Sequence, residues 1–305
     1  MKIAILSRAI NEGNYTTNRL KEEAIKHGHE VQVIDHVQCY ASIEAKKPVI
    51  SYMGEDLDDF DAIIPRIGYS VTRYGTAIVR QFEMRGVYTT ASSMAIVRSR
   101  DKLRSMQLLA RAGVDIPKTI FARDASDADG LIDAIGGTPI IIKLARGTHG
   151  NGVVLAETKK AAKSVLQAFY LMDEDGTNIL LQEFVKESAG EDIRAFVVGN
   201  KVVASMRRKS LDDEFRSNLH QGGTGEAIKL TDEERKTALK AAKTMGLPIC
   251  GVDMMRSHRG PLVLEVNSSP GLGIELVTNR NIAGRIIEYI ELNAKRKQKK
   301  DRIGA

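Results

Sequence analysis

Oxygen-bearing side chains on two strand-like segments in the C-terminal part of the chain have a spacing that suits a metal ion. If the turn between these segments centres near His258–Arg259, Asp253 lies across from Glu265, although a register shifted by one residue stays open. Glu265 and Asn267 are two positions apart on one strand, so both side chains project from the same face. Ligand sets made only of oxygen favour a hard cation, Mg²⁺ or Mn²⁺. The alternative is an ordinary solvent-facing strand, and the pairing with Asp253 favours the metal site.

A lysine followed by a glycine-rich loop lies earlier in the chain, in the stretch IIIKLARGTHGNGVVL (140–155). The P-loop and the dinucleotide-binding fingerprint both open a helix, and in the P-loop the lysine follows most of the glycines. Here Lys143 precedes Gly147, Gly150 and Gly152, and the β-branched residues that come next predict a strand. We therefore expect a hairpin flap, which either covers phosphate groups or is an ordinary flexible hairpin.

Further basic groups stand at strand ends or beside glycines. Arg66 ends a predicted strand, where it would contact either an anion or a neighbouring carboxylate. Arg207 lies near the end of another strand, and the segment FRSNLHQGG (215–223) follows, in which Arg216 and Asn218 are spaced to reach phosphate or carboxylate oxygens. A run of charges is most often a solvated face. Carboxylates on one side with Lys and Arg on the other, however, are the pattern of a site for a nucleoside triphosphate and Mg²⁺.

The elements that must position these groups begin with a parallel sheet. Over residues 1–95, strand patterns alternate with helix patterns, which predicts covered sheet faces and a ligand at the carboxyl ends of the strands. The expected strands are 2–6, 30–35, 61–68 and 87–92, and the expected helices are 15–27 and 72–85. Residues 99–112 are then expected to form one helix with Ser99 as its N-cap.

The remainder of the chain predicts a small α+β region up to about residue 181 and a more β-rich region after it. The first region is expected to contain a strand near 119–124, the glycine hairpin, and helices over 127–135 and 159–171. The second is expected to contain hairpins that turn at 199–200 and 259–260, a helix over 231–245 with a capping box, and a last helix from about residue 281.

Bulk properties exclude several classes of protein. At 305 residues, 43% hydrophobic and 28% charged, the chain is ordinary for a globular protein of about two domains. It has no apolar run near the ~20 residues of a membrane span, and its apolar start is too short for a signal peptide. Cys39 and Cys250 form no metal or redox motif, which fits a reducing cytoplasm. Residues 295–305 carry six Lys and Arg against one Asp, so the rest of the chain is nearly neutral and no specific DNA binding is expected.

The order of these motifs resembles the ATP-grasp superfamily of carboxylate–amine ligases, and within it the RimK-type glutamate ligases. The resemblance rests on the strand lysine, GTHGNG, QEFV, DIRAFVVG, FRSN, Asp253 and EVNSSPG, and for the narrower family on PRIG, DKLRSMQLLARAG and GPLVLEVNSSPGL. It covers nearly the whole chain. It implies an ATP-grasp fold, of mixed α/β and α+β class, with an N-terminal parallel-sheet (pre-ATP-grasp) domain over 1–97, a lid subdomain over 98–184, and a C-terminal subdomain over 185–305 that holds the metal site and a basic C-terminal helix.

The resemblance also implies roles for individual residues. Nucleotide contacts would come from Lys143 and Lys102 at the phosphates, Gly150 in the hairpin over them, Glu183 and Phe184 at the adenine, Asp192 on the ribose side, and Arg216, Ser217 and Asn218 at phosphate, with Arg216 and Asn218 catalytic. Asp253, Glu265 and Asn267 would hold two Mg²⁺ or Mn²⁺ ions, with Glu265 bridging them. Arg66 and Arg207 would contact substrate. His149 and His220 would be loop residues and not general bases.

The activity implied is an ATP-dependent ligation through an acyl phosphate. L-Glutamate would be joined by an α-peptide bond to the C-terminal tail of the sixth protein of the small ribosomal subunit, or to itself as poly-α-glutamate. The enzyme is expected to be a cytoplasmic homo-oligomer, a tetramer, that contacts no membrane. One alternative keeps the chemistry and changes the acceptor to a pterin or deazaflavin coenzyme or an amino-acid carrier protein. Another is an ATP-binding regulatory protein without turnover, which the intact Asp253, Glu265 and Asn267 set disfavours.

Overall fold

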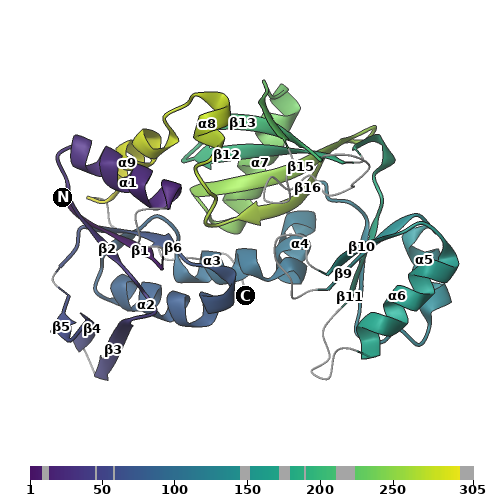
Figure 1. Ribbon diagram of the computed structural model, residues 1–305, viewed down its shortest axis with the longest axis horizontal. Helices are drawn as coiled ribbons and strands as arrows, with labels where there is room; N and C mark the ends of the chain where they lie inside the picture. Colours follow the sequence, from purple (N-terminus) through teal and green to yellow (C-terminus); the bar gives the residue numbers. More distant parts are fainter. Residues whose placement is uncertain are drawn as a thin grey trace.

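The N-terminal region forms the expected parallel sheet. The computed structural model describes residues 1–8, 14–44, 47–57, 59–144, 152–171, 179–188, 190–210 and 224–295. The strands of this sheet lie in the order β2 (Glu30–Ile34), β1 (Lys2–Ser7), β6 (Ala62–Arg66) and β7 (Tyr88–Thr89). Helices α1 (Tyr15–Lys26) and α2 (Thr72–Met84) belong to the same region, and the short 3-10 helix η1 (Tyr69–Val71) leads into α2 (Figure 1). Arg66 therefore lies at the carboxyl end of a central strand.

A small antiparallel sheet between β2 and β6 was not expected from the sequence. Its strands are β3 (Cys39–Glu44), β4 (Lys47–Tyr52) and β5 (Glu55–Asp56). Gln81 of α2 donates from Nε2 to the carbonyl oxygens of Ser42 at 3.0 Å and Val49 at 3.2 Å, which fixes the sheet against that helix. The strands are short, so their stability depends on this tertiary contact more than on local propensity.

The expected single helix over 99–112 is wrong. The chain forms α3 (Ser93–Arg100) and α4 (Lys102–Arg111), with a break at Asp101. Ser92 caps α3 and Asp101 caps α4, where its carboxylate accepts the backbone N–H of Arg104 at 3.0 Å. Ser99 instead lies inside α3, and its hydroxyl donates to the carbonyl of Ile96. An aspartate in extended conformation satisfies the free N–H groups of a helix start, so Asp101 can begin a second helix there.

The middle of the chain builds a four-stranded antiparallel sheet, here called the lid sheet, with two helices. The strand order is β10 (Val153–Ala156), β9 (Ile140–Leu144), β11 (Ile179–Glu183) and β8 (Thr119–Ala122). Helices α5 (Ala128–Ile135) and α6 (Lys159–Leu171) pack on it and close a hydrophobic core, and the described residues of this core all come from this region. The lid sheet and its helices lie to the right in Figure 1.

The last region is a five-stranded antiparallel sheet, here called the core sheet. Its strand order is β14 (Thr224–Ala227), β13 (Lys201–Lys209), β12 (Glu191–Val198), β15 (Ile249–Ser257) and β16 (Gly260–Asn267). Helix α7 (Asp232–Met245) begins with the expected capping box of Thr231 and Glu234. The short 3-10 helix η2 (Lys186–Ser188) precedes the sheet, and α8 (Ile274–Thr278) and α9 (Ile282–Asn293) follow it. Asp253 pairs with Glu265, so the expected register is confirmed.

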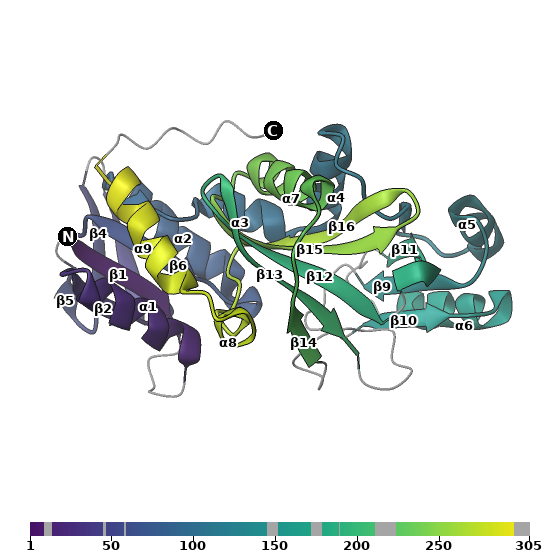
Figure 2. The same ribbon diagram turned by 90° about the horizontal axis from the view of Figure 1, so that it is seen from above.

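The N-terminal and core sheets share their hydrophobic interior. One cluster joins Ile34 and Phe82 to Val252 and Met254, and a second joins residues of β1 and α1 to residues of α9. Helix α9 consequently lies alongside α1 (Figure 2). Among the described residues, no helix combines the length and the apolar character needed to cross a membrane.

Candidate nucleotide and metal site

One face of the core sheet carries a continuous set of charged side chains. Cross-strand partners share a face, and the register pairs Arg208 with Asp192, Arg194 with Asp253, and Asp253 with Glu265. Asp192 and Arg194 are two apart on β12, which extends the same face across four strands. The opposite face carries apolar residues that pack with α7 in a buried core. We call the charged side the polar face.

Asp253 is held as a carboxylate by two arginines. Arg194 donates from Nε to Oδ1 at 2.7 Å and from Nη2 to Oδ2 at 2.6 Å, and Nη2 of Arg208 lies 2.9 Å from Oδ2. Arg208 also makes a bidentate pair with Asp192. Burial acts to raise the pKa of Asp253, but the attraction and hydrogen bonds of the two guanidinium groups hold this pKa well below its usual range.

Glu265 is in the opposite electrostatic situation although it lies directly across from Asp253. Glu265 is exposed as a whole residue, but protein atoms around its carboxyl group, and secondly repulsion by Asp253, raise the pKa of Glu265. Two carboxyl groups that face each other favour a cation between them, because it removes this repulsion. The Asn267 side chain, on the same strand face, uses Oδ1 to accept the backbone N–H of Ser269 at 3.0 Å, and this oxygen retains a second lone pair.

These three residues fit a hard divalent cation as a partial ligand set. Nowhere in the described part of the chain do three or more His, Cys, Asp or Glu side chains gather in a group that could hold a metal. Two carboxylates and one amide oxygen would leave about half of the positions of an octahedral Mg²⁺ to water and phosphate, which is how this ion is usually bound beside a nucleotide. The donor set is therefore consistent with an ion that arrives with its triphosphate.

Lysines from two other elements approach Glu265. Lys143 of β9 donates from Nζ to Oε1 of Gln182 at 2.6 Å. Burial, and secondly repulsion by Lys102, lower the pKa of Lys143 to about 8, while Glu265 acts in the other direction. Burial also lowers the pKa of Lys102 at the start of α4, again against the attraction of Glu265. The lid sheet, α4 and the core sheet thus bring two cations to the carboxylate pair that the sequence singled out.

Two further arginines at this site were not identified from the sequence. Arg194 lies two residues after Asp192, so strand alternation could have placed it on the polar face. Arg100 could not be found in this way, because the expected continuous helix hid the break that follows it. Arg100 donates from Nη2 to the carbonyl of Ile67 at 2.8 Å. Burial lowers its pKa, against the attraction of Glu265 and Tyr69.

The other residues predicted to bind the nucleotide or the substrate lie away from the Asp253–Glu265 pair or outside the described residues. Glu183 ends β11, where it accepts the backbone N–H of Lys118 at 2.6 Å and pairs with Arg259, and Phe184 follows it half-buried. Arg207 alternates with Arg208 and so points away from the polar face. It pairs with Glu226 at 2.6 Å and Glu191 at 3.5 Å. Gly150, Arg216, Ser217, Asn218, His149 and His220 lie outside the described residues, as does the basic tail from residue 296.

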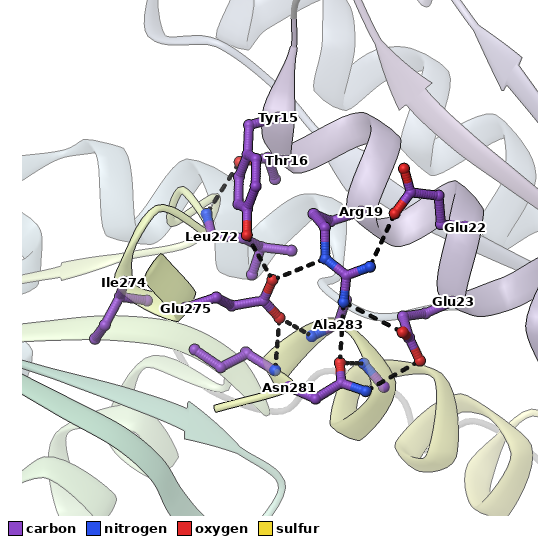
Figure 3. A network of polar contacts seen from close by, with 12 residues as sticks. Tyr15, Thr16, Arg19, Glu22, Glu23, Leu272, Ile274, Glu275, Asn281 and Ala283 are labelled. Atoms are coloured by element: carbon purple, nitrogen blue, oxygen red, sulfur yellow. Dashed lines mark hydrogen bonds and ion pairs between the residues drawn. The ribbon is translucent and has the colours of Figure 1, made fainter. Parts of the chain in front are cut away.

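The segment that follows Asn267 is fastened to α1 by a polar network (Figure 3). Leu272 donates its backbone N–H to Oγ1 of Thr16 at 2.9 Å. The buried Glu275 accepts the N–H groups of Ile282 at 2.6 Å and Ala283 at 2.8 Å, and also accepts from Arg19 at 3.1 Å. This network fixes the end of β16, and with it the strand that carries Glu265 and Asn267.

The arrangement of a lid sheet over the polar face of a larger antiparallel sheet, preceded by a parallel sheet, is the ATP-grasp fold. Residues 99–290 match the RimK-like ATP-grasp domain and residues 1–96 match the RimK PreATP-grasp domain. The chain therefore belongs to the RimK-like ATP-grasp family. This membership confirms the predicted fold and the predicted class of enzyme, an ATP-dependent carboxylate–amine ligase.

Individual relatives extend this likeness over the full length. A probable alpha-L-glutamate ligase of Cellvibrio japonicus is 59% identical over 296 residues, which cover 97% of both chains. Another of Vibrio cholerae is 58% identical over 303 residues, which cover 99% of both. Among solved structures, the ATP-grasp ligase PsnB in complex with a minimal precursor, Mg and ADP is 20% identical with a TM-score of 0.72, over 97% of this chain and 98% of that one. The last comparison supports the fold.

Proposed function

We propose that the protein joins L-glutamate through its α-amine to the terminal carboxylate of a glutamate-accepting chain, with ATP as the energy source. The observation that carries this proposal is the convergence of Lys143 and Lys102 on the Asp253–Glu265 pair. A carboxylate pair beside lysines suits a metal-bound triphosphate. Relatives with 58–59% identity that carry the name probable alpha-L-glutamate ligase support glutamate as the amino acid.

The chemistry requires two steps. An oxygen of the acceptor carboxylate attacks the γ-phosphorus of ATP, ADP leaves, and an acyl phosphate forms. The α-amine of glutamate then attacks the acyl carbon, loses a proton, and expels inorganic phosphate as the amide forms. No side-chain nucleophile is needed, so the protein contributes positioning and charge neutralisation.

The residues divide these tasks between them. Asp253, Glu265 and Asn267 would hold two Mg²⁺ or Mn²⁺ ions, which supply charge neutralisation at the phosphate oxygens. Lys143 and Lys102 would contact the phosphates from the lid side and from the start of α4. The contacts proposed for the remaining nucleotide-binding residues follow from the family resemblance: Glu183 and Phe184 with adenine, Asp192 with the ribose side, and Gly150, Arg216, Ser217 and Asn218 with phosphate, Arg216 and Asn218 as catalytic groups.

We propose that the active enzyme is a homo-oligomer, a tetramer. The acceptor that we propose is the C-terminal tail of the sixth protein of the small ribosomal subunit, or a growing poly-α-glutamate chain. Both acceptors end in a carboxylate and become more acidic with each addition. A cation-rich site suits such a product, and Arg66 is a candidate contact beside the polar face. Arg207, the second candidate, lies on β13, points away from that face and pairs with Glu226, so it would contact a part of the acceptor outside the site.

A single incubation tests the proposal. The protein is mixed with ATP, Mg²⁺ and L-glutamate, with and without the purified ribosomal protein, and phosphate release and product mass are followed. We expect phosphate release that depends on glutamate, together with mass additions of one glutamate residue at a time. Release only with a pterin, a deazaflavin coenzyme or a carrier protein would overturn the proposed acceptor, and tight ATP binding without any release would overturn the proposed activity.

A further inference from the structure

Two arginine side chains meet at the junction between the N-terminal sheet and the core sheet. Arg66, at the end of β6, donates from Nη1 to the carbonyl of Pro270 at 2.7 Å, and Arg100, at the end of α3, donates to the carbonyl of Ile67 at 2.8 Å. Burial, and secondly repulsion by Arg100, lower the pKa of Arg66 to about 10. Arg100 holds the carbonyl of the residue that directly follows Arg66, so the two half-buried side chains lie near each other.

This pair differs from the arginines of the polar face. Arg194 and Arg208 are each neutralised by an aspartate. Within the described ranges, neither Arg66 nor Arg100 has an ion pair with a carboxylate of the protein. Buried charges are normally paired, because desolvation without a partner is costly. Arg66 and Arg100 are half-buried, donate to backbone carbonyl groups, and have no described carboxylate in direct contact, so the pair suits an anion that arrives as a ligand.

Hydrogen-bond donors without acceptors surround the pair. Nε of Arg100 and the hydroxyl groups of Ser268 and Ser269 are buried and have no hydrogen-bond partner in the described structure. The two serines directly precede Pro270, whose carbonyl holds Arg66. Arg66 and Ser268 also line a cavity of about 20 Å³, which has room for one water and whose other walls are mostly apolar. Buried donors that lack an acceptor are rare in folded proteins and call for a specific explanation.

The position of these groups connects them to the reaction. Arg100 is attracted by Glu265, the central carboxylate of the metal site. Arg66 lies at the carboxyl end of a parallel strand, where open α/β sheets bind ligands. A planar carboxylate matches the fork of a guanidinium group and accepts hydrogen bonds from serine hydroxyls as well. The incoming glutamate carries two carboxylates that do not react, and an acceptor that ends in glutamate carries one besides the carboxylate that is phosphorylated.

We infer that Arg66 and Arg100, together with the hydroxyl groups of Ser268 and Ser269, form a subsite for a substrate carboxylate that does not react. The inference rests on the proposed function, which supplies glutamate-type substrates. The ligand is a carboxylate of the incoming glutamate or of the last residue of the acceptor, and the two sources share the same chemistry. The subsite selects and orients the substrate, and the phosphates are bound elsewhere, by the lysines and the metal.

The test compares Arg100→Gln with Arg111→Gln, a matched control at the exposed end of α4. The Michaelis constants for glutamate and for the acceptor are measured separately at saturating ATP. For Arg100→Gln we expect one of these constants to rise about 30-fold or more, because a charge-assisted contact is lost, while kcat falls less than about threefold. The substrate whose constant rises is the source of the bound carboxylate. Arg100→Lys should recover part of the loss, and Arg111→Gln should behave like wild type.

A second measurement separates this role from a purely structural one. Because the carboxylate is absent from the free enzyme, Arg100→Gln should unfold at the same temperature as wild type or at a higher one. A lower unfolding temperature with unchanged Michaelis constants would make Arg100 structural and overturn the inference. Unchanged constants for Arg100→Gln and Arg66→Gln in an enzyme that needs glutamate would also overturn it and leave the proposed function intact. A wild-type enzyme with no response to glutamate would instead refute the proposed function, and the subsite with it.

Discussion

At the scale of single residues, Asp253 and Glu265 show how neighbouring carboxyl groups acquire different properties. Arg194 and Arg208 keep Asp253 ionised, whereas desolvation of the carboxyl group by nearby protein atoms, and secondly the charge of Asp253, raise the pKa of Glu265. A divalent cation reverses the second effect, because it attracts the ionised form of Glu265. Asp253 is thus a fixed charge, and Glu265 is the group whose charge depends most on what is bound.

Glu265→Gln should lower glutamate-dependent phosphate release about 100-fold or more, because the charge that would hold the metal ions is lost. The folded state should not be destabilised, since the substitution removes repulsion with Asp253. Activity and thermal unfolding are measured together, with Glu288→Gln on the exposed side of α9 as the matched control. Wild-type activity in Glu265→Gln would refute the metal assignment.

Lys143 should make ATP binding depend on pH. Its pKa of about 8 in the free protein lies below the usual lysine value, so the side chain is charged below pH 8 and becomes neutral as the pH rises. A triphosphate prefers the charged form, so its dissociation constant should increase up to about tenfold between pH 7 and 9, with proton uptake near pH 8.

Calorimetry in buffers of different ionisation enthalpy measures both quantities. Lys143→Arg should remove the dependence attributed to this residue, because arginine stays protonated throughout, while Lys160→Arg on the exposed face of α6 should keep it. An identical pH profile for wild type and Lys143→Arg would contradict the contact with phosphate.

At the scale of elements, the sequence predicted which residues of the strands share a face better than it predicted where the helices begin and end. The pairing of Asp253 with Glu265 followed from the two-residue alternation of side chains in a strand and from the position of one turn. Both of these are local features of the sequence. The break at Asp101 depends on which of two candidate residues caps a helix, and the helix pattern alone does not decide this. The β3–β5 sheet depends on contacts with α2 that are distant in sequence. The position of Arg100 depends on the helix break, so the sequence did not reveal it. Strand alternation, in contrast, predicted that Asn267 lies on the same strand as Glu265.

The helix break can be tested with two matched substitutions. Asp101→Ala should destabilise the protein by about 1 kcal/mol, because it removes the side-chain cap of α4. It should also weaken ATP binding, since Lys102 is the first residue of that helix. Ser99→Ala should have a smaller effect on stability and none on ATP binding. The reverse ranking in urea denaturation would favour a single helix over residues 99–112.

The network behind β16 makes Glu275 a structural anchor. Glu275→Ala should destabilise the protein by about 3 kcal/mol or more, because two backbone N–H groups and Arg19 lose their acceptor in a buried place. Glu22→Ala also removes a partner of Arg19, but from an exposed ion pair, so it should cost less than about 1 kcal/mol. Equal effects in urea denaturation would contradict the anchoring role.

At the scale of the whole molecule, the lid sheet has its own hydrophobic core, whereas the N-terminal and core sheets share theirs. Lys143 therefore belongs to a separately packed part, and Arg66, Arg100 and Glu265 belong to the larger one. Closure over a nucleotide would bring the two parts together and exclude water from an acyl phosphate, which water would otherwise hydrolyse.

Hydrogen exchange should resolve these two parts. Amides of β9 and β11 in the lid sheet should open at a lower free energy than those of β12 and β15, since the smaller core stabilises them. A non-hydrolysable ATP analogue with Mg²⁺ should slow exchange in β9 and β11 more than in the N-terminal sheet. Equal protection of all three sheets before and after addition would show that the protein opens only as one unit.

The packing of α9 against α1 also bears on how the protein is made. The interior beneath β1 and α1 is closed by Ile282, Ile286 and Ile290, side chains that lie more than 250 positions further along the chain. During translation the first strands cannot bury their apolar surface until this distant helix has left the ribosome. We therefore expect the N-terminal third to stay open to aggregation over that interval, while the lid region, with its local core, can already fold.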